Sequence, residues 1–115
     1  MSVKIYHNPR CSKSRQTLQL LEQHGEQAQV IEYLKDTPSR LELQTVLSLL
    51  KLQPRELMRK GEAIYKELQL GNDALSDDQL IDAMLQHPIL IERPIVLANG
   101  KAAIGRPPES VLEIL

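Results

Sequence analysis

Residues 94–104, Pro-Ile-Val-Leu-Ala-Asn-Gly-Lys-Ala-Ala-Ile, decide the fold at the carboxyl-terminal end of the chain. Asn99-Gly100 separates two apolar runs, and this pair favours a type I′ turn, which needs a positive φ at both central positions. The stretch therefore predicts a β-hairpin with strands over 94–98 and 101–104. A last helix is expected over 109–115, after the Gly-Arg-Pro-Pro segment that follows the hairpin.

The amino-terminal end predicts a strand, a helix and a second strand. Residues 2–7 alternate apolar and polar side chains, and Asn8-Pro9 ends this strand. A helical pattern runs from Cys11 to His24 and stops at Gly25, and residues 28–34 are rich in β-branched and apolar types. Such a βαβ unit almost always has parallel strands and a right-handed crossover.

The middle of the chain is expected to be helical. Ser39 with Glu42, and Ser76 with Gln79, match the capping box that begins a helix, and Pro54 opens a short helical turn. The order βαβ, helical middle, ββα predicts an α/β protein with a thioredoxin-like fold that carries a helical insertion between its two halves. With 115 residues, we expect one domain over 1–115.

Composition excludes several classes of protein. Hydrophobic residues make up 42% of the chain, which is typical of a globular domain and excludes a disordered or membrane-spanning protein. The net charge of −1 and the lack of Trp and Phe argue against a nucleic-acid partner. The first residues lack the apolar core of a signal peptide, so we expect a cytoplasmic protein. The three histidines have no ligand-like spacing to the one cysteine, so no metal site is expected.

Cys11 is the candidate reactive residue. Residues 1–21 contain four cationic residues and no acid, and Cys11 lies among them at the predicted strand-to-helix junction. Neighbouring cations and the free N–H groups of a helix start lower the pKa of a thiol, which favours a thiolate over a buried structural cysteine. Position 14 is Ser14, so the chain lacks the Cys-x-x-Cys pair of a dithiol oxidoreductase.

Three arginines are candidates for binding an anion. Arg59 follows the apolar pair Leu57-Met58, while Arg93 and Arg106 each directly precede a proline, at the two ends of the predicted hairpin. Each one alone has the ordinary interpretation of a solvated surface arginine. Their positions together favour an anion site, although the sequence does not show that they converge on Cys11.

Several separated motifs occur in the order typical of one family. The chain resembles the ArsC family of glutaredoxin-coupled arsenate reductases over essentially its whole length, and it ends early, like the short YfgD-like branch of that family. The motifs are Ile5-Tyr-His-Asn-Pro9 with Cys11 and Ser14-Arg15, Leu57-Met-Arg-Lys60, Asp77-Asp-Gln-Leu-Ile81, Gln86-His-Pro-Ile-Leu90, Arg93-Pro-Ile-Val96 and Gly105-Arg-Pro107.

The resemblance implies a role for each candidate residue. Cys11 is the expected nucleophile, and Arg59, Arg93 and Arg106 are expected to bind arsenate and its intermediates. His7 and Ser14 are implied as supporting groups near the sulfur, and the Arg93–Pro94 peptide bond is expected to be cis.

The resemblance also implies the partners of the reaction. Glutathione is the expected co-substrate, a glutaredoxin the expected protein partner, and no bound cofactor is expected. Two other functions stay open. One is a monothiol glutathione-dependent oxidoreductase, and the other is a regulatory partner protein like Spx, although Spx proteins commonly carry the Cys-x-x-Cys that Ser14 interrupts here.

Overall fold

The computed structural model describes residues 2–115 and divides the chain into two compact units. The sheet unit comprises residues up to Asp36 and from Arg93 onward, and the helical unit comprises Thr37–Glu92. The sheet unit contains β1 (Lys4–Tyr6), α1 (Ser12–Gln23), β2 (Gln29–Ile31), β3 (Ile95–Ala98), β4 (Lys101–Ile104) and the 3₁₀ helix η3 (Pro108–Ile114). The helical unit contains α2 (Arg40–Leu50), η1 (Pro54–Leu57), α3 (Ala63–Glu67), α4 (Asp77–Gln86) and η2 (Pro88–Leu90).

The four strands form a mixed sheet in the order β2-β1-β3-β4. β1 and β2 run parallel, with α1 as the crossover between them, and Ile5 lies opposite Val30. β3 runs antiparallel to both β1 and β4. The predicted βαβ and ββα halves and the insertion between them are confirmed, and so is the α/β thioredoxin-like fold class. The prediction that the two units form one domain stays a prediction.

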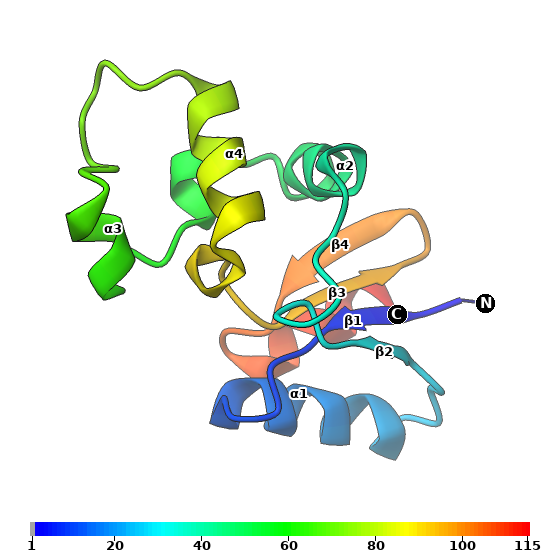
Figure 1. Ribbon diagram of the computed structural model, residues 1–115. Helices are drawn as coiled ribbons and strands as arrows, with labels where there is room; N and C mark the ends of the chain where they lie inside the picture. Colours follow the sequence, from blue (N-terminus) through cyan, green and yellow to red (C-terminus); the bar gives the residue numbers. More distant parts are fainter. Residues whose placement is uncertain (1) are drawn as a thin grey trace. The chain divides into compact units, whose positions relative to one another are not determined.

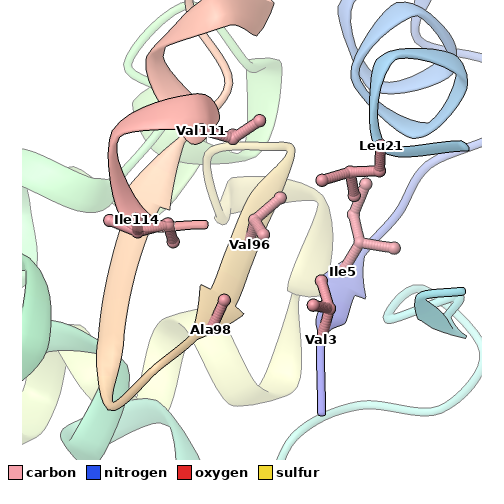
Figure 2. Packing of buried hydrophobic residues seen from close by; sticks show 7 residues of the cluster. All are labelled: Val3, Ile5, Leu21, Val96, Ala98, Val111 and Ile114. Carbon is pink, nitrogen blue, oxygen red and sulfur yellow. The ribbon is translucent and has the colours of Figure 1, made fainter. Parts of the chain in front are cut away.

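The core of the sheet unit lies between the sheet and the two helices α1 and η3. Alternate strand residues point to this face, among them Ile5 and Val96, which are both fully buried (Figure 2). Leu21 of α1 and Val111 of η3 meet them from the other side. α1 and η3 therefore cover the same face of the sheet (Figure 1). With no Phe or Trp available, aliphatic side chains form this layer.

The hairpin has the predicted turn. Asn99 and Gly100 adopt φ angles of 56° and 69°, as a type I′ turn requires. The Asn99 side-chain amide also donates a hydrogen bond to the Ile114 carbonyl at 2.8 Å. This bond ties the turn to the end of η3.

Three predicted elements differ from the observed ones in extent or type. β1 and β2 have three residues each, fewer than predicted. β2 ends early because the N–H groups of Lys35 and Asp36 both donate to the Glu32 carbonyl, which turns the chain. The last helix is a 3₁₀ helix, Pro108–Ile114, and its Pro-Pro start has no N–H to give to the usual helical pattern.

The helical unit begins its longer helices with the predicted capping boxes. The Ser39 hydroxyl accepts from the Glu42 N–H at 3.1 Å, and the Ser39 N–H donates to the Glu42 carboxylate at 3.0 Å. Ser76 and Gln79 make the same pair of bonds at the start of α4. Arg40 of α2 forms ion pairs with two aspartates of α4, Asp78 and Asp82. Over the described residues, no helix is long and apolar enough to cross a membrane.

Candidate active site

Cys11 lies where β1 passes into α1, at the N-cap position of the helix. After β1, the His7 N–H still donates to the Ile31 carbonyl of β2 at 2.8 Å, and the chain then turns. The Cys11 N–H closes this turn by donating to the Asn8 carbonyl at 3.0 Å. Cys11 therefore lies at the start of the helix, as predicted. Its thiol is half-buried and within reach of solvent, which was also predicted.

Two arginines of the sheet unit meet at the sulfur. Nη2 of Arg106 lies 3.5 Å from Sγ of Cys11, and Nε of the same guanidinium donates to the Arg93 carbonyl at 2.8 Å. The Arg93 side chain also hydrogen-bonds Cys11, and its Nε and Nη1 atoms are buried. Residues 82 and 95 positions beyond Cys11 in the sequence thus come to one thiol. The structure brings Cys11, Arg93 and Arg106 together.

The hairpin geometry orients both arginines. β3 and β4 run antiparallel, so the start of β3 lies beside the end of β4. The residue before β3 and the residues after β4 are therefore neighbours. The Gly105 N–H donates to the Pro94 carbonyl at 2.9 Å and holds them together. The Arg93–Pro94 peptide bond is cis, as predicted, and the Arg106–Pro107 bond is cis as well.

The surroundings of Cys11 lower the pKa of its thiol. Partial burial alone raises the pKa, because a charged sulfur loses hydration. The backbone N–H of Ser14, the Arg93 side chain and the backbone N–H of Lys13 together outweigh this effect by stabilising the thiolate. The net shift is downward from the ordinary value, which is about 8.5 for a free cysteine. The lowered pKa that the sequence predicts therefore has a specific origin in the first helical turn and in Arg93.

Alkylation of Cys11 by iodoacetamide is expected to reach half of its maximum rate at a pH below about 8.5, because the thiolate is the reacting species. The measurement is the alkylation rate from pH 5 to pH 10, followed by mass spectrometry. The same chain in denaturant provides the control, and its midpoint should return to the ordinary value. A folded midpoint equal to or above that of the unfolded chain contradicts the assignment.

His7 and Ser14 form a buried pair next to the thiol. Nδ1 of His7 lies 2.6 Å from Oγ of Ser14, and the same oxygen accepts from the Asn8 N–H at 3.0 Å. Burial lowers the pKa of His7, Glu32 raises it and Arg15 lowers it, with a net shift downward, so the imidazole is neutral at pH 7. The pair stabilises the loop that carries Cys11. That His7 and Ser14 also support the chemistry at the sulfur stays a prediction.

Gly105 is required by a close approach between the hairpin and α1. A Cβ atom at this position would lie 2.7 Å from Cγ of Pro94 and would overlap Oγ1 of Thr17, a fully buried residue of α1. The Thr17 hydroxyl is fixed because it donates to the Lys13 carbonyl at 2.7 Å. Only glycine lets Arg106 follow β4 this close to α1.

Gly105→Ala is therefore expected to destabilise the fold by about 1–3 kcal/mol, the usual cost of overpacking. Because the added Cβ also pushes on Pro94, the residue after Arg93, it should move Arg93 away from the sulfur and raise the pKa of Cys11. Urea unfolding gives the first quantity and the alkylation profile gives the second. Gly61→Ala is the matched control, since a Cβ there meets nothing within 4 Å and the glycine has no positive φ. Equal stability of the two variants contradicts the close-approach argument.

Arg59 belongs to the helical unit and is bound by two carboxylates. Its Nε donates to Glu62 at 3.2 Å and its Nη1 donates to Glu92 at 2.8 Å. Its backbone N–H donates to the Leu90 carbonyl at 2.7 Å, next to the β-bridge of Met58 and Ile91. Burial lowers the pKa of Arg59, and the two glutamates raise it by more. Its convergence with Cys11 stays a prediction.

Sequence reasoning missed two residues that shape the site. Arg15 donates from Nη1 to the Pro9 carbonyl at 2.9 Å, so it holds the Cys11 loop as well as adding charge. Gly105 belongs to the Gly-Arg-Pro motif, and its packing against Thr17 explains why this position needs glycine. The one sequence signal that could have identified them is their position next to two candidate site residues, Ser14 and Arg106.

A thioredoxin-like sheet with one cysteine of lowered pKa at the start of its first helix and two arginines at the sulfur forms a candidate monothiol active site. The chain belongs to the ArsC family, whose family model matches residues 6–114. It is 55% identical over 114 residues to the uncharacterised protein YfgD of Escherichia coli, covering 98% of this chain and 96% of that protein. It is 52% identical to an arsenate reductase of Haemophilus influenzae, with both chains covered completely. A solved structure of an arsenate reductase from Vibrio cholerae is 59% identical, with a TM-score of 0.97 over 100% of this chain and 98% of that one.

Proposed function

We propose that this protein is an arsenate reductase, an oxidoreductase that converts arsenate to arsenite through a covalent adduct on Cys11. The observation that carries the proposal is the placement of Arg106 Nη2 3.5 Å from the sulfur of an activated cysteine. Relatives of the same length that are named arsenate reductase support the choice of oxyanion.

The first step joins sulfur to arsenic. The Cys11 thiolate attacks arsenic, an S–As bond forms, and an As–O bond breaks as the oxygen leaves as water after protonation. Arsenate carries negative charge near neutral pH, so a thiolate and arsenate repel each other. Arg93 and Arg106 offset this repulsion, because planar guanidinium groups bind tetrahedral oxyanions through paired hydrogen bonds. Arg59 is proposed to add a third guanidinium.

Electrons then come from two thiols outside the chain, since the sequence has one cysteine. Glutathione replaces a second oxygen on arsenic, and the oxygen again leaves as water. A glutaredoxin thiolate attacks the glutathione sulfur and forms a mixed disulfide with it. The bond between the glutathione sulfur and arsenic breaks with its electron pair staying on arsenic, which becomes As(III) and remains bound to Cys11. Water then releases arsenite and restores Cys11. The scheme needs no resident cofactor, and we place it in the cytoplasm, where glutathione keeps thiols reduced.

The experiment that tests this proposal measures arsenite production by the purified chain with arsenate, glutathione and glutaredoxin, each omitted in turn. Arsenite should form only when all three are present. Formation of one mixed disulfide for each arsenite checks the electron balance.

Two further measurements, mixed-disulfide reduction and a pull-down, separate the two other functions. A monothiol oxidoreductase reduces a glutathione mixed disulfide at full rate without any oxyanion. A regulatory protein produces no arsenite under any combination and is retained by polymerase subunits in a pull-down. Either result contradicts the proposal.

A further inference from the structure

A recess lies beside the Cys11 loop in the sheet unit. It has a volume of about 260 Å³ and is lined by residues from two loops, 7–10 and 32–35. These loops follow β1 and β2, and because the two strands are parallel, both loops leave the same edge of the sheet. No step assigned to Cys11, Arg93 or Arg106 uses this pocket.

The pocket is connected to the reactive thiol through the chain itself. Arg10 lines it and directly precedes Cys11, and Asn8, which also lines it, accepts the Cys11 N–H at 3.0 Å. The Arg10 N–H donates to the Asn8 side-chain carbonyl at 3.0 Å, so the turn that positions Cys11 also forms one wall of the pocket. A molecule bound in this pocket would contact Arg10, and Cys11 is the next residue in the sequence.

The charges in the pocket fit one kind of small molecule. Arg10 and Lys35 supply two cations and Glu32 supplies one carboxylate, while exposed Leu34 adds an apolar side chain. The Lys35 ammonium lies 3.9 Å from the Glu32 carboxylate, and both side chains are largely exposed. Such a surface pair holds its partners weakly, so both groups are available to a ligand. The complementary ligand carries two carboxylates and one ammonium.

Glutathione has this charge pattern, with an ammonium and a carboxylate at one end, a carboxylate at the other and the thiol between them. The pocket volume is slightly below the range of about 300–1,000 Å³ that is typical of small-ligand sites. A pocket of this size has room for the charged ends of a tripeptide, and the wall that carries Arg10 continues directly into Cys11. A glutathione held there would be bound next to the residue on which the arsenic adduct is proposed to form.

We propose that this pocket binds the glutathione that supplies the second thiol, with Arg10 and Lys35 on its carboxylates and Glu32 on its ammonium. The inference rests on the proposed function for its role in the reaction. The thiol of the bound glutathione forms an S–As bond to the Cys11 adduct, an As–O bond breaks, and the thiol proton leaves with the hydroxyl as water. Arsenic stays As(V) in this step, because one ligand replaces another without a change of oxidation state.

The test uses two charge reversals in the full chain. Lys35→Glu puts a carboxylate in the pocket, and Lys101→Glu makes the same change at an exposed residue of β4 outside it. Binding of S-methylglutathione, which has no free thiol, is measured by calorimetry without arsenate. We expect Lys35→Glu to weaken binding about tenfold or more, the scale of one charged hydrogen bond, and Lys101→Glu to leave it unchanged.

The kinetic arm measures KM for glutathione and for arsenate in both variants. KM for glutathione should rise about tenfold in Lys35→Glu while KM for arsenate stays within about twofold. Equal S-methylglutathione affinity in Lys35→Glu and the original chain, or none in either, overturns the pocket. Arsenite formation with an unchanged KM for glutathione also overturns it and leaves the proposed function standing. Lys35-dependent binding without arsenite formation supports the pocket and contradicts the proposed function.

Discussion

Cys11→Ser is expected to lower arsenate reduction by at least about a thousandfold, because the chain has no other thiol to form the bond to arsenic. A serine hydroxyl stays protonated near neutral pH, and the groups that lower the pKa of the Cys11 thiol cannot ionise it. The measurement is kcat/KM for arsenate with saturating glutathione and glutaredoxin.

Cys11→Ser distinguishes loss of the reacting thiol from loss of the fold. Cys11 occupies the N-cap of α1, where serine is one of the most favourable residues, so the fold should be retained. The thermal unfolding midpoint of the variant should equal or exceed that of the original chain. Arsenite formation by a folded Cys11→Ser protein at more than a few per cent of the original rate contradicts a covalent mechanism.

Arg106→Lys is expected to reduce kcat/KM for arsenate about ten- to a hundredfold although the charge is kept. The guanidinium of Arg106 bonds in two directions, from Nε to the Arg93 carbonyl and from Nη2 to the Cys11 sulfur. A lysine ammonium lacks this planar fork and cannot make both contacts in the same geometry. Loss of one charge-assisted hydrogen bond costs about 1.5–3 kcal/mol, which corresponds to the expected range.

The same substitution at Arg93 and Arg59 is expected to give losses of similar size. Arg40→Lys is the matched control, because Arg40 forms ion pairs with Asp78 and Asp82 in the helical unit and has no assigned role in catalysis. Its kcat/KM should change less than about threefold. Thermal unfolding of each variant excludes loss of fold as the cause. Equal, small losses at all four positions mean that charge acts diffusely and that no arginine clamp exists.

Local sequence signals predicted the elements whose determinants are local. The Asn99-Gly100 turn, the Ser39 and Ser76 capping boxes and the helix start at Cys11 each depend on residues within four positions of one another. The short helix α3 has no such signal. Its N-cap is Glu62, whose side chain makes no capping bond, and so the sequence did not indicate where it begins.

The candidate site depends on contacts that a sequence does not show by itself. Arg106 reaches Cys11 across 95 positions, and it can do so because Gly105 packs against Thr17. The contact of Arg59 with Glu92 could not be predicted either, since Glu92 lies 33 positions away. The expected roles of Cys11 and the arginines came from the resemblance to a family. The fold explains why Arg93 and Arg106 can both contact the same sulfur.

The most direct test of the central claim is protection of Cys11 by arsenate against alkylation. The claim is that the thiolate and its two arginines bind arsenate at the sulfur. The purified chain is treated with iodoacetamide at pH 7 over a series of arsenate concentrations, at constant ionic strength kept with chloride, and labelling of Cys11 is followed by mass spectrometry. We expect the labelling rate to fall to a plateau near zero with increasing arsenate, and Arg106→Lys to shift the midpoint to about ten- to a hundredfold more arsenate. A labelling rate that is the same at every arsenate concentration contradicts the account.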